Sequence, residues 1–162
     1  MKIRKAVPDK DWKNIWPLVK NVFRKGDSFP QSPDITEKEA FEYWHIKPHE
    51  TWVCVNAGGD ILGIYYIKPN QECLGSHVSN CGYMVAEKHR NKGVAAKMCM
   101  HSLNRAKEMG FIAMQYNLVV STNEVAVYLW KKMGFEIKAV LPHAFRHKEL
   151  GFVDALVMYK VL

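Results

Sequence analysis

The chain has 162 residues, 48% of them hydrophobic, and a net charge of +7 at neutral pH. This composition excludes a disordered tail and suits one domain with a real core, and no apolar run is long enough to cross a bilayer. The N-terminal stretch "MKIRKAVPDKDW" lacks the apolar segment of a signal peptide, so we expect a single cytoplasmic domain over residues 1–162.

A strand and two helices are predicted at the start of the chain. The strand covers residues 2–7. Asp9 is a candidate cap for the first helix, in which apolar residues recur at helical spacing until Gly26 ends it. Thr36 and Glu39 form a capping-box pattern at the start of the second helix.

The middle of the chain predicts a hairpin and then a strand–helix–strand unit. The hairpin strands, 51–56 and 61–68, flank the turn signal "AGGD". A strand over 77–85, a helix over 92–109 and a strand over 111–120 follow. The last of these shows little polar alternation, which is typical of a strand covered on both faces.

The stretch "STNEVAVYLWKKMGF" predicts the last helix. Ser121 and Glu124 form a capping-box pattern at its start, and Gly134 is placed to end it. Strands over 135–141 and 152–162 complete the chain, and we expect "PHAFRHKELG" to join them.

The predicted order is β-α-α-β-β-β-α-β-α-β-β, with no internal repeat and no linker long enough to separate a second domain. Strands and helices that alternate in this way favour an α/β fold. We expect a mixed sheet with helices on both faces.

The cysteines favour neither zinc nor disulfides. Cys54, Cys73, Cys81 and Cys99 show no C-x-x-C spacing, and disulfides are rare in the cytoplasm. Cys54 and Cys81 fall in apolar runs that predict strands, so we expect both thiols to be buried.

Positive charge is spread along the chain and is densest in "EKHRNKG", residues 87–93. A cluster of this kind beside a glycine favours a phosphate-bearing ligand over a long nucleic-acid track. A solvated loop is the alternative interpretation.

Arg90, Gly93 and Ala95 follow a recognisable pattern between the strand over 77–85 and the next helix. A strand-to-helix loop exposes backbone N–H groups without helical partners, and the helix dipole adds positive potential there. Gly93 leaves room for a phosphate, and Lys88 and Lys92 add charge. The spacing predicts a pyrophosphate site, although an ordinary glycine loop has a similar pattern.

"RNKGVA" (90–95) resembles the pyrophosphate loop of the GNAT acyltransferase superfamily, and "NEVAVYLWKKMGF" (123–135) resembles its second CoA-contacting helix. The element order also matches. The resemblance implies a GNAT-like mixed, mostly antiparallel sheet and an acetyl-CoA-dependent N-acetyltransferase without a metal. The implied CoA-binding residues are Met84, Val85, Arg90, Asn91, Lys92, Gly93, Val94, Ala95, Asn123 and Trp130.

The resemblance also implies a mechanism. The backbone around Met84 and Val85 pairs with the pantetheine arm, and the Val85 N–H stabilises the oxyanion while the amine attacks directly. Asn123 donates a hydrogen bond to the departing thiolate. The family often has a Tyr seven residues after this Asn, but Trp130 stands there in this chain. Tyr128 lies about 140° away around the helix, which favours a packing role over an acid.

"SNCGYMV", "YNLVVSTN" and "LW" together are similar to fungal N-acetyltransferases that act on proline-like imino acids such as azetidine-2-carboxylate. This similarity implies a small amino or imino acid as acceptor, with Asn80 and Asn117 near its carboxylate. Each amide has an alternative role in satisfying nearby backbone groups.

The general base is left open by the sequence. Glu72, His77, Glu87 and Asp154 are candidates by residue type alone, and a chain of water molecules would also serve. In "PHAFRHKELG", the side chains of His143, Arg146 and His147 could line a substrate entrance. No metal site is expected there, because a third ligand is missing.

Other functions remain open at this point. They are a protein or peptide N-acetyltransferase on the same fold, a non-catalytic acyl-CoA-binding module, and, with less support, a nucleic-acid binder. We expect no membrane partner, and a homodimer is left open.

Overall fold

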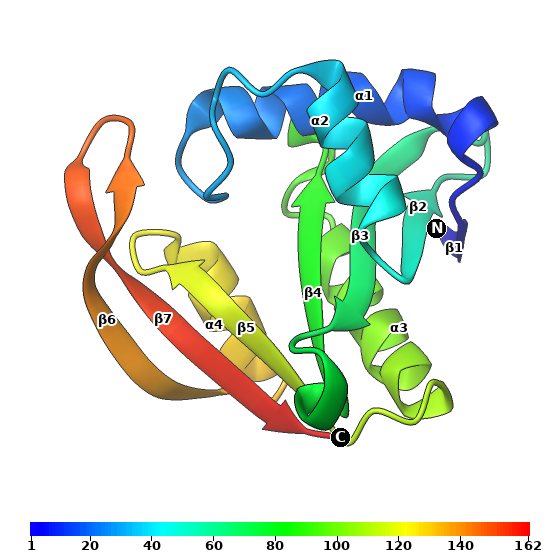
Figure 1. Cartoon of the computed structure of the whole chain (residues 1–162). Coiled ribbons are helices and arrows are strands. Elements are labelled where there is room, and N and C mark those ends of the chain that lie inside the picture. The colour runs from blue at the N-terminus through cyan, green and yellow to red at the C-terminus, as the bar shows by residue number, and fades with distance from the viewer.

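The computed structural model describes all 162 residues, which form one seven-stranded sheet with helices on both faces (Figure 1). The predicted order of strands and helices is confirmed. In chain order the elements are β1 (Lys2–Lys5), α1 (Pro8–Lys25), α2 (Glu37–Phe41) with a π-helical turn (Glu42–Ile46), β2 (Glu50–Val55), β3 (Ile61–Pro69), β4 (Val78–Val85), α3 (Val94–Glu108), β5 (Ala113–Val120), α4 (Glu124–Lys132), β6 (Glu136–His147) and β7 (Gly151–Val161).

The strands lie in the order β1-β2-β3-β4-β5-β7-β6, and every neighbouring pair is antiparallel except β4 and β5. This arrangement confirms the expected mixed, mostly antiparallel sheet. The parallel pair joins only Val78 to Ala113 and Ser79 to Met114. Beyond those positions β4 and β5 diverge, as Figure 1 shows, although both strands continue for six more residues.

Two hydrophobic clusters hold the helices to the sheet. On one face, buried residues of α1 and the π-helical turn, including Ile15, Phe23 and Trp44, pack on Val53 and Ile64. Burying side chains of this size stabilises the fold by roughly 1.5–3 kcal/mol each. We call this side of the sheet the α1/α2 face.

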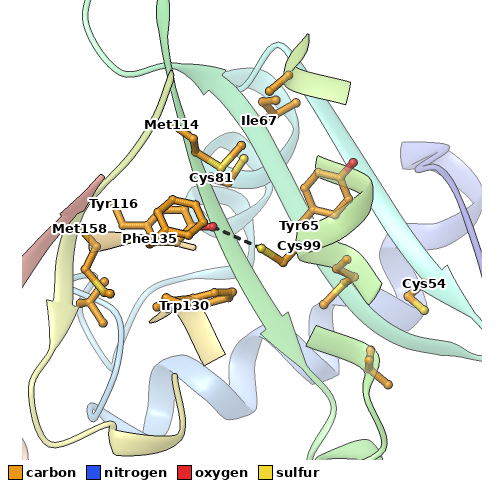
Figure 2. Close-up of a cluster of buried hydrophobic side chains, with 14 of the residues drawn as sticks. Cys54, Tyr65, Ile67, Cys81, Cys99, Met114, Tyr116, Trp130, Phe135 and Met158 are labelled. Atoms are coloured by element: carbon orange, nitrogen blue, oxygen red, sulfur yellow. Dashed lines mark hydrogen bonds between the residues drawn. The ribbon is translucent and has the colours of Figure 1, made fainter. Parts of the chain in front are cut away.

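The opposite face carries α3 and α4, and we call it the α3/α4 face. Met98 and Cys99 of α3 and Trp130 of α4 lie in its cluster. Figure 2 shows Cys99 and Trp130 among its members. Cys54 and Cys81 are also buried here, at 0% and 6% exposure, so the prediction for both thiols is confirmed.

Helix ends agree with the sequence in some places and differ in others. The Thr36–Glu39 capping box is present, and Gly26 ends α1 with a φ of 60°. The predicted Asp9 cap is wrong, because α1 begins at Pro8 after Val7. Asp11 performs the capping instead, since its carboxylate accepts the Val7 N–H at 2.7 Å.

The predicted cap of α4 is also wrong. Asn123 is the N-cap, and its Oδ1 accepts the Ala126 N–H at 3.3 Å, so Ser121 and Glu124 form no capping box. Asn is as good a cap as Ser, and the chain leaves β5 too late for Ser121 to take that place.

The predicted loop 142–151 is mostly strand. β6 continues to His147, so only residues 148–150 separate it from β7. The pairing of β6 with β7 shifts register between Leu141 and Phe145, and Pro142 and His143 lie in this irregularity. His143 has a φ of 54°, and the strands pair again from Phe145. No helix in the structure combines the length and apolar character needed to span a bilayer.

Candidate functional site

The parting of β4 and β5 leaves backbone groups of β4 without a strand partner. Hydrogen bonds from Asn70 N to Val78 O (2.7 Å) and from Ala86 N to Leu62 O (2.9 Å) show which residues face β3. The backbone N–H and C=O groups of a strand point to alternate sides from one residue to the next. The even-numbered residues of β4 therefore point their amides at β3. The amides of odd-numbered residues, among them Val85, therefore point toward the opening.

Met84 is placed differently from Val85. It is the register partner of Ile64 on β3, and its side chain is 2% exposed within the α1/α2 face cluster. Its own amide therefore belongs to the β3 pairing. An extended ligand in the opening would find Val85 and not Met84 as its backbone partner.

Six consecutive backbone N–H groups, those of residues 91–96, make no hydrogen bond within the chain. Asn91 and Gly93 are left-handed, with φ of 59° and 75°, and the first bond of α3 is from Lys97 N to Gly93 O. Such turns collect N–H groups into an anion-binding concavity, and the N-terminus of α3 adds its dipole. We call residues 91–96 the anion cradle.

The anion cradle is open where a ligand would approach. A Cβ placed on Gly93 would meet no atom within 4 Å. Arg90 and Lys92 are exposed beside it, and Lys92 Nζ donates to the Lys88 carbonyl at 2.9 Å. The residues predicted to bind pyrophosphate are thus brought together, and their shape and charge suit a diphosphate.

A cavity of about 670 Å³ lies behind this loop, between α1 and the turn joining β2 to β3. Lys25, Val85, Lys88 and Arg90 are among its lining residues. Lys25 Nζ lies 2.7 Å from Glu87 Oε1, and this hydrogen bond lowers the pKa of Glu87. A carboxylate of lowered pKa is a weaker base, so Glu87 is a poor candidate for the general base.

Trp130 and Tyr128 lie on different sides of α4, as their angular separation predicts. Trp130 is 8% exposed, and its ring lies 5.0 Å from the rings of both Tyr83 and Tyr116. Figure 2 shows Trp130 beside Tyr116. Tyr128 is 69% exposed. The predicted packing role of Tyr128 is therefore wrong, because its side of α4 faces solvent and not the core.

A buried network of hydroxyl and thiol groups surrounds Trp130, and the sequence did not indicate it. Tyr83 Oη lies 2.7 Å from Ser102 Oγ and 3.0 Å from Tyr116 Oη. Tyr116 Oη in turn contacts Cys99 Sγ at 3.8 Å (Figure 2). Burial raises the pKa of both tyrosines well above 10 and that of Cys99 to about 11. These groups stay protonated at neutral pH.

A chain of hydrogen bonds crosses the α1/α2 face at the opening. Tyr66 Oη donates its hydrogen to Asn80 Oδ1 at 3.2 Å. Tyr43 Oη is therefore the donor in its 3.1 Å hydrogen bond with Tyr66 Oη. Asn80 Nδ2 donates to the Gln115 carbonyl on β5 at 2.9 Å. An amide cannot pass a proton on as a phenol can, so this chain fixes positions and does not conduct protons.

Asn117 continues this polar surface. Its Oδ1 accepts from Gln115 Nε2 at 2.8 Å, and its Nδ2 donates to Asn70 Oδ1 at 2.7 Å. The structure therefore brings the predicted Asn80 and Asn117 to one surface. Sequence reasoning missed Tyr43, Tyr66 and Asn70, because the face that each side chain shares with Asn80 depends on the pairing of the strands.

The remaining base candidates lie elsewhere. Glu72 and His77 are exposed in the segment before β4. Asp154 accepts the His143 backbone N–H at 3.0 Å within the β6–β7 hairpin. None of them has a hydrogen bond to the Tyr43–Asn80 chain.

Of the three residues predicted to line a substrate entrance, two lie at one cavity. Arg146 and His147 line a cavity of about 490 Å³ between residues 26–33 and the β6–β7 hairpin, whereas His143 does not. Lys148 N donates to the Gly26 carbonyl at 3.0 Å and closes one side of this cavity.

Comparisons with known proteins agree with this geometry. The model of the Acetyltransferase (GNAT) family matches residues 12–135. N-acetyltransferase aca1 of Schizosaccharomyces pombe is 36% identical over 98 residues, covering 60% of this chain and 47% of that protein. L-amino acid N-acetyltransferase AaaT of Escherichia coli is 30% identical over 104 residues, covering 64% of this chain and 63% of that protein.

Among solved structures, a GCN5-related N-acetyltransferase from Kribbella flavida superposes with a TM-score of 0.93 at 35% identity. This match covers 99% of the chain and 97% of the other. The matched region spans about half of aca1 and just under two thirds of AaaT, although it spans nearly all of the Kribbella chain. With a family model over most of its length and this likeness in fold, the chain belongs to the Acetyltransferase (GNAT) family.

Proposed function

We propose that this protein transfers an acetyl group from acetyl-CoA to the amine of a small amino or imino acid. One observation carries the proposal: β4 and β5 part after Ser79, and the free edge of β4 leads to a cradle of six unpaired backbone N–H groups beyond its C-terminal end. The opening suits an extended arm and the cradle suits a diphosphate, and CoA joins these two parts in one molecule.

Residues 91–96 would hold the diphosphate by their backbone N–H groups, and Arg90 and Lys92 would add positive charge. The amide of Val85 would pair with the pantetheine arm as one more strand. Met84 would contribute by anchoring that strand edge to β3. Trp130 would form part of the wall on the α3/α4 face.

Bound acetyl-CoA supplies a thioester carbonyl that an amine attacks directly, so the protein needs no acyl-enzyme. The Val85 N–H at the open edge would stabilise the charge that develops on the carbonyl oxygen, a contact worth about 3–4 kcal/mol in other enzymes. Asn123 uses Oδ1 for the α4 cap and keeps its Nδ2 hydrogens available to the departing thiolate. A thiol with a pKa of about 8.5 leaves tolerably well without a side-chain acid.

The acceptor would approach from the α1/α2 face, where Asn80 and Asn117 present amide groups. Each Nδ2 carries a second hydrogen beyond the one already donated, which could bind a carboxylate. The relative AaaT is described as an L-amino acid N-acetyltransferase, which supports an amino acid as acceptor.

Thiol release from acetyl-CoA tests the proposal across amino acids, imino acids, polyamines and peptides. We expect turnover with at least one free amino or imino acid. Activity confined to peptides would favour a protein N-acetyltransferase. Binding of CoA without turnover on any amine would favour a non-catalytic acyl-CoA-binding module, in keeping with the tryptophan at position 130.

A further inference from the structure

Lys68 brings a positive charge to the hydrogen-bonded chain on the α1/α2 face. It is half-buried on β3 and is the register partner of Asn80 on β4. Its Nζ lies 5.8 Å from the centroid of the Tyr66 ring. Lys68 takes part in none of the ion pairs of the structure, so this cation has no carboxylate within 4 Å.

The position of Tyr66 relates this charge to the opening in the sheet. A Cβ on Gly82 would lie 2.6 Å from an atom of the Tyr66 ring, so the ring rests directly on the Gly82 backbone. Gly82 precedes Tyr83, whose odd-numbered amide faces the opening. The Lys68 ammonium therefore lies over the Tyr66 ring, and this ring contacts Gly82. Gly82 is one residue before Tyr83, whose amide faces the opening.

We propose that Lys68 binds the carboxylate of the acceptor and so makes the enzyme selective for free amino and imino acids. This inference rests on the proposed function and names the residue that selects its substrate class. A half-buried lysine without an acidic partner gains from an anionic ligand. Partial burial removes some of the water around its ammonium group, and a carboxylate replaces that water with a charge-assisted hydrogen bond. The second Nδ2 hydrogens of Asn80 and Asn117 would complete the carboxylate site.

The same charge disfavours other amines. A polyamine would bring a second cation toward Lys68, and like charges in a partly desolvated site repel. A peptide carries no carboxylate on the carbon next to its terminal amine. An α-amino acid holds both groups on one carbon, so its carboxylate enters the site together with the reacting amine.

The test compares acceptors with and without a carboxylate. Azetidine-2-carboxylate is paired with azetidine, and L-leucine with 3-methylbutylamine, in the wild type and in Lys68→Met, Lys68→Arg and the control Lys107→Met on the exposed side of α3. We expect Lys68→Met to lower kcat/KM for the acids about tenfold or more and to change the carboxylate-free amines less than twofold. Lys68→Arg should recover much of the loss, and KM for acetyl-CoA should stay constant throughout.

Each outcome decides a separate point. A wild type that turns over both members of each pair equally, or a Lys68→Met variant that slows both equally, overturns the role of Lys68 and leaves acetyl transfer standing. A wild type that acetylates no amine overturns the proposed function itself. Product binding gives a readout independent of turnover: N-acetyl-leucine should bind the wild type with CoA present and lose about tenfold in affinity in Lys68→Met.

Discussion

Asn80 Nδ2 donates to the Gln115 carbonyl at 2.9 Å, one residue beyond the last backbone pair of β4 and β5. The side chain takes the place that the next backbone bond of the ladder would occupy. Its Oδ1 accepts from Tyr66 on β3, so one buried amide ties three strands together where the sheet opens.

Replacing Asn80 by Ala should therefore loosen this point. Asn80 is 7% exposed, and its removal leaves the Tyr66 hydroxyl and the Gln115 carbonyl without their partner. We expect a loss of about 1–3 kcal/mol in the free energy of unfolding, measured in urea, and a higher KM for acetyl-CoA. Asn104→Ala on the exposed side of α3 is the control. Unchanged stability in Asn80→Ala would contradict the bridging role.

The anion cradle offers a matched pair of glycine substitutions. Gly93 and Gly110 lie at opposite ends of α3 with φ of 75° and 84°, and a Cβ on either meets no atom within 4 Å. Alanine at either site should cost about 1 kcal/mol of stability, because both residues are left-handed. Only Gly93→Ala should weaken CoA binding, by about tenfold in calorimetry. Equal affinity in the two variants would place the diphosphate elsewhere.

Tyr128→Phe should leave kcat within about twofold of the wild type, since the hydroxyl lies on an exposed surface away from Trp130. Steady-state kinetics and a thermal melt check this together. A collapse of kcat in a folded variant would show that Tyr128 acts as the acid after movement of α4.

Glu50 gives the fold a pH dependence in acid. Hydrogen bonds from Arg105, followed by Trp52 and Lys5, lower the pKa of Glu50 to about 2, against the opposing effect of burial. Its folded pKa lies below the ordinary glutamate value of 4.5, so its stabilising effect is full above pH 4.5. That contribution is lost as the pH falls toward 2.

Glu50→Gln should therefore flatten the unfolding free energy between pH 4.5 and pH 2. At pH 7 the variant should lose about 1–3 kcal/mol, because Arg105 keeps a weakened partner. Urea unfolding at several pH values measures both effects. Glu149→Gln, in the exposed hairpin tip, is the control. An unchanged pH slope in Glu50→Gln would assign the acid sensitivity to other carboxylates.

The order of elements followed from periodicity because each helix and strand carries its own apolar pattern. The cradle was predicted for a similar reason, since its loop, glycine and helix start are contiguous in sequence. Local errors arose where two residues compete for one role, as Ser121 and Asn123 did for the cap of α4.

The hydrogen-bonded chain on the α1/α2 face could not be predicted in this way. Tyr43, Tyr66, Asn80 and Gln115 belong to four elements, and their contacts depend on strand register. The length of β6 was missed because the bulge beside Pro142 depends on pairing with β7. Lys68 shows no local feature that separates it from other lysines, and only its place in space beside Tyr66 and Asn80 distinguishes it.

The anion cradle presents main-chain donors to any ligand that it binds, and this affects how the site tolerates change. Replacing Asn91, Lys92 or Val94 by alanine leaves every one of the six N–H donors in place, provided that the turn keeps its shape. Alanine scanning of this loop would therefore underestimate its contribution to ligand binding. If the loop binds a diphosphate as proposed, relatives can differ at most of its positions and still present the same donors, because a backbone path and not a set of side chains must be inherited.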